Sequence, residues 1–211
     1  MSNNPSTKVH PVPAVLLAGG ASLRLGQPKQ LLRLAQFNGE TLLDHAVHLA
    51  QESGADPVYV VLGALAEHIQ RDAQLTNCTV LLNPDWAEGM ASSLRTGIRA
   101  VMELNPLASA ALLMVCDQPA LSAEHLRQLL ATHYAEPEIV AASCYANRSG
   151  VPVVVPSKLF SALLELHGDQ GARAVLKQAG LRVKEIDFPD GAWDIDSPED
   201  LPRGVTGVGA T

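Results

Sequence analysis

A glycine-rich segment with two cations carries the clearest chemical signal in the sequence. It follows an apolar run and contains Gly19, Gly20, Ser22, Arg24 and Lys29. Consecutive glycines let backbone N–H groups approach an anion closely, and the three polar side chains add donors and positive charge. A triphosphate needs this combination, because fixed positive charge also stabilises a leaving pyrophosphate. The segment therefore predicts a phosphate-binding loop, although a turn whose cations only face solvent is the alternative.

Two better-known nucleotide-binding motifs do not fit this loop. No Gly-Lys-Ser/Thr sequence closes it, and Pro28 stands where a Walker A loop has its glycine. The loop also lacks the GxGxxG pattern of dinucleotide-binding folds. Both a P-loop ATPase and a dinucleotide-dependent oxidoreductase are therefore disfavoured.

An acidic residue stands at a position that suits a metal ion. Asp117 directly follows the apolar run Ala110–Cys116. A carboxylate at the C-terminal end of a buried strand is costly without a cation, and it suits a hard divalent ion. We therefore assign Asp117 to Mg²⁺, with Mn²⁺ as a substitute. An N-cap role is the alternative, although Pro119 and Ser122 already supply residues typical of a helix start.

Two further segments begin candidate helices with small or polar residues. Ser92 and Ser93 stand near the start of one helix, where polar groups of a ligand bind well. The two serines could equally serve as caps or small packing residues. Gly171 and Arg173 belong to the other segment, which is typical of an anion-facing helix N-terminus.

Short apolar runs alternate along the chain with longer amphipathic stretches. The apolar runs predict strands at Ala14–Ala18, Pro57–Leu62, Thr79–Leu82, Ala110–Cys116, Ile139–Cys144, Val151–Val155 and Val183–Ile186. The amphipathic stretches predict helices at Leu42–Ser53, Leu65–Ala73, Met90–Glu103, Ala123–Tyr134, Ser157–His167 and Ala172–Ala179. Continuously apolar strands are typical of a parallel sheet covered on both faces. The alternation predicts a doubly wound, three-layer α/β fold, whose ligands bind at the C-terminal ends of the strands.

Bulk composition narrows the class of protein. The 211 residues suit one domain, and 47% apolar residues supply a core. A net charge of -7 argues against nonspecific nucleic-acid binding. Three widely spaced cysteines are typical of buried, reduced thiols, and the apolar run Val12–Ala18 is too short for a signal or membrane segment. We expect a cytoplasmic protein with one domain over residues 12–201, flanked by flexible tails at residues 1–11 and 202–211.

At the loop, the sequence resembles a known family. Leu16-Leu17-Ala18-Gly19-Gly20-x-Ser22-x-Arg24-x-Gly26-x-x-Lys29 is similar to the signature of the MobA-like NTP transferases. This family includes the molybdenum cofactor cytidylyl- and guanylyltransferases and related sugar and methylerythritol nucleotidyltransferases. The resemblance covers Leu16 to Leu201 and implies a Rossmann-like fold of the nucleotide-diphospho-sugar transferase type. It also implies a Mg²⁺-dependent enzyme that moves a nucleoside monophosphate onto a phosphorylated acceptor.

The resemblance also implies roles for individual residues. Arg24, Lys29 and Asp117 would act in catalysis, and Asp196 of the closing motif would complete the metal site. Asp194 is the alternative second ligand, since alternation on a strand would place it on the same face as Asp196, and helix capping is a further role for this segment. The residues expected to bind the nucleotide are Leu17, Ala18, Gly19, Gly20, Ser22, Arg24, Gly26, Lys29, Gly63, Asn83, Gly89, Ser92, Ser93 and Asp117.

Three motifs are similar to the cytidylyltransferase branch: residues 83–97, Cys116-Asp117-Gln118-Pro119 and the segment 168–173. The form Leu17-Ala18-Gly19-Gly20 is closer to the guanylyltransferases. We expect CTP as donor and molybdopterin as acceptor, with a molybdoenzyme as protein partner. Gly171 and Arg173 would bind the acceptor, or Arg173 would have a structural role. The alternatives are a guanylyltransferase, a sugar-phosphate nucleotidyltransferase and a non-catalytic chaperone that delivers the cofactor.

Overall fold

Seven strands form the central sheet of the computed structural model, which describes residues 10–177 and 180–202. They are β1 (Ala14–Ala18), β2 (Val58–Leu62), β3 (Thr79–Leu82), β4 (Ala110–Val115), β5 (Val140–Tyr145), β6 (Arg148–Pro156) and β7 (Val183–Asp187). Their order across the sheet is β3-β2-β1-β4-β6-β5-β7. Only β6 runs against its neighbours in this described sheet. The expected mostly parallel α/β fold is confirmed.

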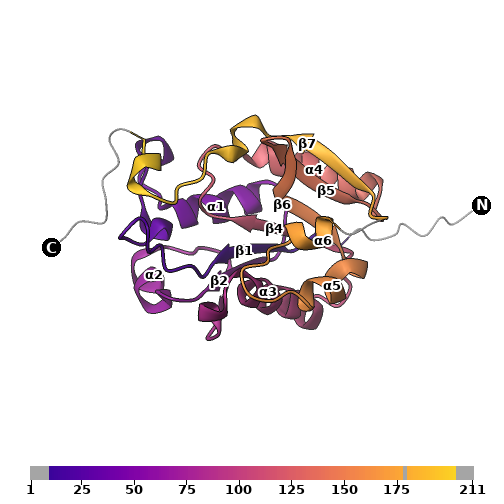
Figure 1. Ribbon diagram of the computed structural model, residues 1–211, viewed down its shortest axis with the longest axis horizontal. Helices are drawn as coiled ribbons and strands as arrows, with labels where there is room; N and C mark the ends of the chain where they lie inside the picture. The colour runs from indigo at the N-terminus through magenta and orange to yellow at the C-terminus, as the bar shows by residue number, and fades with distance from the viewer. Residues whose placement is uncertain (1–9, 178–179, 203–211) are drawn as a thin grey trace, which may run out of the picture.

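Helices cover both faces of the sheet because successive strand side chains point to opposite sides. Leu16 of β1 packs in one core cluster and Val15 in the other. The first cluster includes side chains of α1 (Leu42–Glu52), α2 (Ala66–Asp72) and α4 (Ala123–Ala135). The second includes side chains of α3 (Met90–Leu104), α5 (Phe160–Leu164) and α6 (Arg173–Leu176). Figure 1 shows α1 and α4 on one side of the sheet and α3 and α5 on the other.

Helix α3 is the element that approaches β1 most closely from its side of the sheet. Its buried residues Leu94, Ile98 and Val101 recur at helical spacing and form its apolar face. At Gly97 a β-carbon would overlap the Val15 side chain, so only glycine allows this approach. The close packing places the first turn of α3 beside the C-terminal end of β1, where the predicted phosphate loop begins.

The predicted elements are largely confirmed, with corrections late in the chain. The helix predicted at Ser157–His167 is a 3-10 turn at Ser157–Leu159 followed by the short α5. Only Arg173–Leu176 of the last predicted helix is helical, and residues 178–179 lie outside the described residues. Strand β6 begins three residues earlier than predicted, because Ala146 and Asn147 adopt left-handed φ values of 49° and 55° and close a hairpin with β5.

Other expectations have mixed outcomes. The segment from Asp194 to Asp196 is not a strand, so the alternation inferred there was wrong. Most of the two predicted tails, residues 1–9 and 203–211, lies outside the described residues. All three cysteines are free, and Cys116 is buried as expected, but Cys78 and Cys144 are partly exposed. Within residues 10–177 and 180–202, no helix has the length and hydropathy that crossing a membrane requires.

Two buried histidines of α4 predict a loss of stability in acid. The His125 ring stacks on Phe188 and lies 2.8 Å from Ser143 Oγ, and His133 Nε2 lies 2.9 Å from Ser109 Oγ. Burial lowers the pKa of both rings below its ordinary value of 6.5. The unfolded chain therefore takes up protons near that pH that the folded protein does not bind. The free energy of unfolding should accordingly fall as the pH is lowered from about 7.5 to about 5.5.

Chemical denaturation across this pH range measures the effect. In His133→Gln the decline should be shallower than in the wild type, because one of the two rings no longer titrates. His48→Gln is the matched control, since His48 is exposed on α1. A decline that is equally steep in His133→Gln and in the wild type would contradict the role of burial.

Candidate active site

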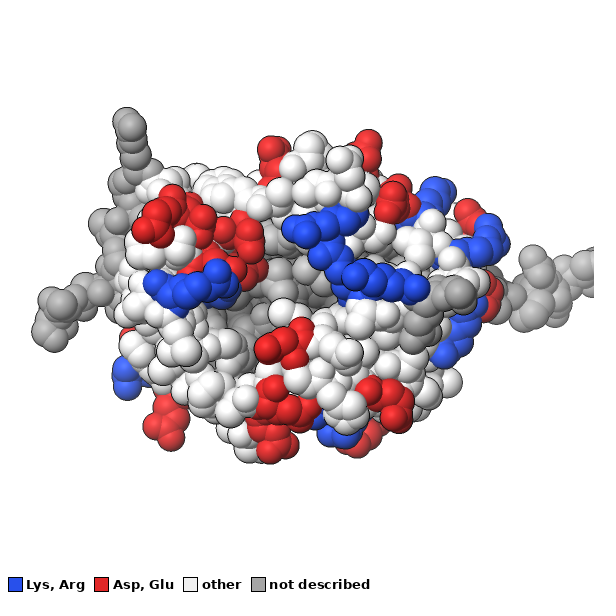
Figure 2. Space-filling view, viewed as in Figure 1, with Lys and Arg blue, Asp and Glu red and all other residues white. Residues whose placement is uncertain are grey.

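A cleft of about 660 Å³ opens at the C-terminal ends of β1 and β4. The segment Leu17–Arg24 forms one wall, and Val115–Asp117 lies at its base. Another wall is formed before and within the first turn of α3, by Trp86, Ala87, Gly89, Met90 and Ser93. Asp169 and Asp196 reach the cleft from later segments. Figure 2 shows Lys and Arg side chains on two sides of a hollow in this face, with Asp and Glu side chains beside one of them. Parallel α/β sheets place their ligand sites at this edge.

The glycine-rich loop is held in a tight path by its own backbone. Ser22 adopts a left-handed φ of 52°, and its carbonyl accepts hydrogen bonds from the N–H groups of Leu25 and Gly26 at 3.2 Å each. Its hydroxyl accepts a hydrogen bond from the backbone N–H of Lys29 at 3.2 Å. Gly26 closes this turn with a φ of 73° and does not line the cleft. Ser22 therefore shapes the loop and brings the start of the Lys29 segment back to the cleft.

The buried side chain of Gln30 holds the backbone of the glycine-rich loop in place. Its side chain is 1% exposed, and Nε2 donates to the carbonyls of Ala18 at 2.9 Å and Gly20 at 3.0 Å. Because a trans peptide points its N–H opposite to its carbonyl, the N–H groups of Gly19 and Ala21 point away from Gln30. Both residues line the cleft. Sequence inspection missed Gln30, since a lone glutamine after a lysine gives no signal of burial.

Gln30→Glu should weaken the loop, because a carboxylate would face two carbonyl oxygens in place of the amide. We expect a free energy of unfolding lower by about 1–3 kcal/mol and a higher KM for the triphosphate. Gln51→Glu is the matched control, because Gln51 also donates to two carbonyls, those of Thr76 and Asn77, but at an exposed place away from the cleft. Equal KM values in the two variants, measured by pyrophosphate release, would contradict the role of Gln30.

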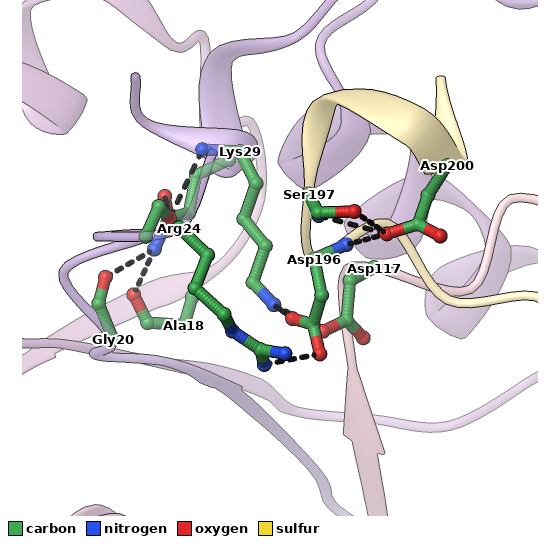
Figure 3. A network of polar contacts seen from close by, with 10 residues as sticks. Ala18, Gly20, Arg24, Lys29, Asp117, Asp196, Ser197 and Asp200 are labelled. Atoms are coloured by element: carbon green, nitrogen blue, oxygen red, sulfur yellow. Dashed lines mark hydrogen bonds and ion pairs between the residues drawn. The ribbon is translucent and has the colours of Figure 1, made fainter. Parts of the chain in front are cut away.

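An ion-pair network joins the loop to the two predicted metal ligands (Figure 3). The Lys29 ammonium nitrogen lies 2.5 Å from Asp117 Oδ2 and 2.7 Å from Asp196 Oδ1. Arg24 Nη2 donates to the other Asp196 oxygen at 2.9 Å. The Lys29 and Asp117 side chains are only 17% and 16% exposed, whereas Arg24 is 74% exposed. The cluster thus brings together Arg24 and Asp196, which are 172 positions apart in the chain.

Backbone and side-chain contacts hold Asp196 in place. The Ile195 N–H donates to the Asp117 carbonyl at 2.9 Å, which ties the late segment to the end of β4. The Asp200 carboxylate accepts hydrogen bonds from the N–H groups of Asp196 and Ser197 and from the Ser197 hydroxyl at 3.1, 2.8 and 2.7 Å. These contacts form the helix start that the Ser-Pro-Glu-Asp sequence predicts. Asp194 is exposed and makes none of the contacts with Lys29 or Arg24.

The charges in this cluster shift one another's pKa values. The hydrogen bond from Lys29 lowers the pKa of Asp196, and the charge of Arg24 adds to this effect. Burial alone would lower the pKa of Lys29, but the ion pair with Asp117 and the hydrogen bonds to both carboxylates raise it above its ordinary value. Partial loss of hydration, together with the charges of Asp117 and Asp196, raises the pKa of Asp194 although its side chain reaches the surface. The ion-pair cluster itself contains two carboxylates, Asp117 and Asp196, and two cations, Lys29 and Arg24.

The donor set fits a divalent metal ion. Oxygens of Asp117 and Asp196 converge on one point, now taken by the Lys29 ammonium group, which stands in for a metal cation. In the described part of the chain, no group of three or more His, Cys, Asp or Glu residues could hold a metal. The remaining ligands would therefore come from water and from a phosphate-bearing substrate, as is usual for Mg²⁺.

Two residues that were predicted to bind the nucleotide, Asn83 and Ser92, do not line the cleft. Asn83 is buried, and its Nδ2 donates to the hydroxyls of Ser92 at 2.8 Å and Ser93 at 3.0 Å. Ser92 is also buried and bonds to the Gly89 carbonyl at 2.8 Å. Ser93 and Gly89 line the cleft, whereas Asn83 and Ser92 do not. Asn83 and Ser92 therefore brace the first turn of α3. Asn83 instead lines a neighbouring hollow of about 670 Å³ together with Gly63.

Gly63 packs tightly against Gly19 and Trp86, between the cleft and the neighbouring hollow. A β-carbon there would lie 2.6 Å from both the Gly19 carbonyl oxygen and the Trp86 β-carbon, so only glycine fits. Trp86 lines both the cleft and the neighbouring hollow. Sequence inspection gave Trp86 no role, although it lies within the segment noted for resemblance.

Gly171 and Arg173 do not line the cleft. Gly171 packs against the Met90 sulfur, and Arg173 Nε donates to the Ser149 carbonyl at 3.1 Å. Of the two roles expected for Arg173, the structural one matches this contact. Asp169, from the same segment, reaches the cleft instead.

The chain is similar in sequence to a family of nucleotidyltransferases and to several known proteins. The sequence model of the MobA-like NTP transferase domain matches residues 14–183. The chain is 34% identical to nicotine blue oxidoreductase of Paenarthrobacter nicotinovorans, over 91% of this chain and 95% of that protein. It is 30% identical to purine catabolism protein PucB of Bacillus subtilis, over 88% and 92% of the two chains. Molybdenum cofactor cytidylyltransferase of Escherichia coli is 23% identical, over 90% and 93%.

A solved structure has the same fold. Rv0371c of Mycobacterium tuberculosis is 29% identical and superposes with a TM-score of 0.78, over 90% of this chain and 96% of that one. Its complex with manganese superposes over the same shares of the chains with a TM-score of 0.73. A divalent metal ion is thus bound by a protein similar to this one.

Proposed function

Because this chain belongs to the MobA-like NTP transferase family, we propose that it transfers CMP from CTP to the terminal phosphate of molybdopterin and releases pyrophosphate. One observation carries the proposal: a glycine-rich loop, two cations and two convergent carboxylates meet in a single cleft. The loop and the two cations suit the phosphates of a triphosphate, and the two carboxylates suit the metal ion bound to it. Nucleotidyl transfer by the family gives the reaction class, while the donor base and the acceptor are the specific proposals.

The loop is proposed to bind the triphosphate tail. The N–H groups of Gly19 and Ala21 donate to phosphate oxygens, while Lys29 and Arg24 neutralise the β- and γ-phosphates as pyrophosphate leaves. A β-carbon at Gly19 would lie 2.7 Å from the Ser93 hydroxyl oxygen, so a side chain there would displace that hydroxyl from its hydrogen bond with Asn83. We place the base and ribose beside Gly89 and Ser93, at the start of α3.

The reaction is proposed to be an in-line displacement at the α-phosphorus by an acceptor phosphate oxygen. An ionised phosphate needs no general base, and no histidine lines the cleft within the described residues. Asp117 and Asp196 would hold Mg²⁺ or Mn²⁺, which supplies charge neutralisation at the phosphates. The protein's own contribution is to fix Lys29, Arg24 and the loop amides around the developing charge.

Choice of donor and acceptor rests on the resemblance of the motifs. Cys116-Asp117-Gln118-Pro119 is similar to the cytidylyltransferase branch, and a molybdenum cofactor cytidylyltransferase is among the full-length relatives. Ala18 before the two glycines favours GTP, so a guanylyltransferase is the main rival. We propose that Gly171 and Arg173 support the acceptor side by holding the segment that carries Asp169, and that a molybdoenzyme receives the product.

A donor screen tests the proposal. Pyrophosphate release is measured with CTP, GTP, ATP and UTP, each with molybdopterin and with simple sugar phosphates as acceptor. We expect release with CTP and molybdopterin together, and little with either alone. Release that requires GTP, or a sugar phosphate, would replace the proposed substrates, and nucleotide binding without any release would favour a delivery chaperone.

A second candidate function follows from the relative named nicotine blue oxidoreductase, which is 34% identical over nearly the whole chain. An oxidoreductase activity on a related compound would need a bound electron carrier. The first loop lacks the glycine pattern that binds dinucleotides. We therefore expect no loss of nicotine blue absorbance when the protein is supplied with the dye and a reduced nicotinamide cofactor. Turnover of the dye would support the second candidate.

A further inference from the structure

We propose that Lys29 is a built-in plug of the metal site, which a triphosphate must draw away before a divalent cation can enter. The inference rests on the proposed function and deepens it, because it makes metal binding conditional on the nucleotide. The Lys29 ammonium group lies at the point where the Asp117 and Asp196 carboxylates converge (Figure 3).

Distances show that the ammonium group and a metal ion cannot both lie between Asp117 Oδ2 and Asp196 Oδ1. The Lys29 nitrogen lies 2.5 Å from an Asp117 oxygen and 2.7 Å from an Asp196 oxygen. Mg²⁺ needs its carboxylate oxygens at about 2.0–2.1 Å in near-octahedral geometry. A metal bound to the same two oxygens would therefore occupy nearly the same place as the Lys29 nitrogen. Entry of the metal requires the lysine to leave.

The position of Lys29 also shows what can draw it away. Its backbone N–H is bonded to Ser22 at the end of the glycine-rich loop, so its side chain spans from the loop to the carboxylates. The four-carbon stem is flexible, and the ammonium group is a compact charge that pairs well with phosphate. A triphosphate on the loop offers Lys29 new anionic partners, which replace the two carboxylates that it gives up. The Arg24 side chain is 74% exposed, so it can likewise give up its ion pair with Asp196 for one with a phosphate.

Two binding events are thereby linked. Without nucleotide, a metal must displace an internal cation that already has two partners. Among the described residues, no third carboxylate joins these two to form a stronger metal site. With nucleotide, Lys29 would release the two carboxylates, and phosphate oxygens would be available as further ligands for a metal ion. Each ligand then strengthens the binding of the other by the same factor, since the coupling of binding free energies is reciprocal.

Binding of Mn²⁺ alone tests the plug. Electron paramagnetic resonance of free Mn²⁺ gives the affinity of the wild type, Lys29→Met and Lys158→Met. Methionine is similar in length but uncharged, so Lys29→Met should bind the metal roughly tenfold more tightly than the wild type. Lys158→Met is the control for net charge, because Lys158 forms an exposed pair with Glu138 away from the cleft. It should leave the affinity unchanged. Lys29→Gln provides a second variant if Lys29→Met does not fold.

The outcomes separate this inference from the proposed function. Tighter Mn²⁺ binding in the Lys29 variants but not in Lys158→Met supports the plug, whether or not pyrophosphate is released. Equal Mn²⁺ affinity in the Lys29 variants and Lys158→Met overturns it, even if the wild type proves to be a cytidylyltransferase. Strong binding of Mn²⁺ by the wild type, matching that of Lys29→Met, overturns it as well.

Discussion

Asp117→Asn should reduce the rate of pyrophosphate release roughly 100- to 1000-fold, which corresponds to about 3–4 kcal/mol of transition-state stabilisation. The amide keeps the shape of the side chain but removes the charge at the point where Asp117 and Asp196 converge. A neutral group holds a divalent cation poorly and no longer orients Lys29. The loss should appear mainly in kcat, since the glycine-rich loop can still bind the triphosphate.

Asp187→Asn is the control for this variant. Asp187 is exposed at the end of β7, so its substitution removes the same charge away from the cleft. Steady-state pyrophosphate release and circular dichroism on both variants separate catalysis from folding. A folded Asp117→Asn protein that turns over at nearly the wild-type rate would rule out the role assigned to Asp117.

Lys29→Met should also reduce pyrophosphate release roughly 100- to 1000-fold, for a different reason. Its charge is proposed to neutralise the leaving pyrophosphate, and a thioether cannot replace it. The same variant should bind Mn²⁺ more tightly in the absence of nucleotide. These opposite effects on turnover and metal affinity cannot come from general unfolding, which would lower both.

Lys158→Met serves as the control here too, with wild-type turnover as the expected result. The rates are measured at saturating Mg²⁺, so that a change in metal affinity does not enter them. Turnover by Lys29→Met within a few-fold of the wild-type rate would show that another group carries the charge of the leaving group.

The core of the fold could be predicted because local pattern and tertiary packing agree. Strands β1, β2 and β4 are short apolar runs that are buried on both faces, and this arrangement is what a continuous apolar sequence favours. The antiparallel direction of β6 could not be predicted in this way, because a buried strand looks alike in either direction. Its hairpin depends on two non-glycine residues with positive φ, Ala146 and Asn147, which the composition of the turn signals only weakly.

Parts of the site could be predicted for a similar reason. Lys29 and Asp117 each follow an apolar strand, and the C-terminal ends of adjacent parallel strands meet at one edge. Their contact follows from the pairing of β1 with β4. Asn83 was harder to interpret, because an amide near a ligand site and an amide that braces two serines give the same sequence signal. Gln30 acts through two backbone carbonyls, and these are contacts that only the folded loop creates.

A crystal structure with Mn²⁺ and a non-hydrolysable CTP analogue tests the central claim most directly. We predict that the anomalous signal of the metal lies between Asp117 and Asp196, with the triphosphate on the loop amides from Gly19 onward. Lys29 should have moved from the carboxylates to a phosphate oxygen. A triphosphate bound elsewhere on the molecule, with the Lys29 ion pairs intact, would contradict the account.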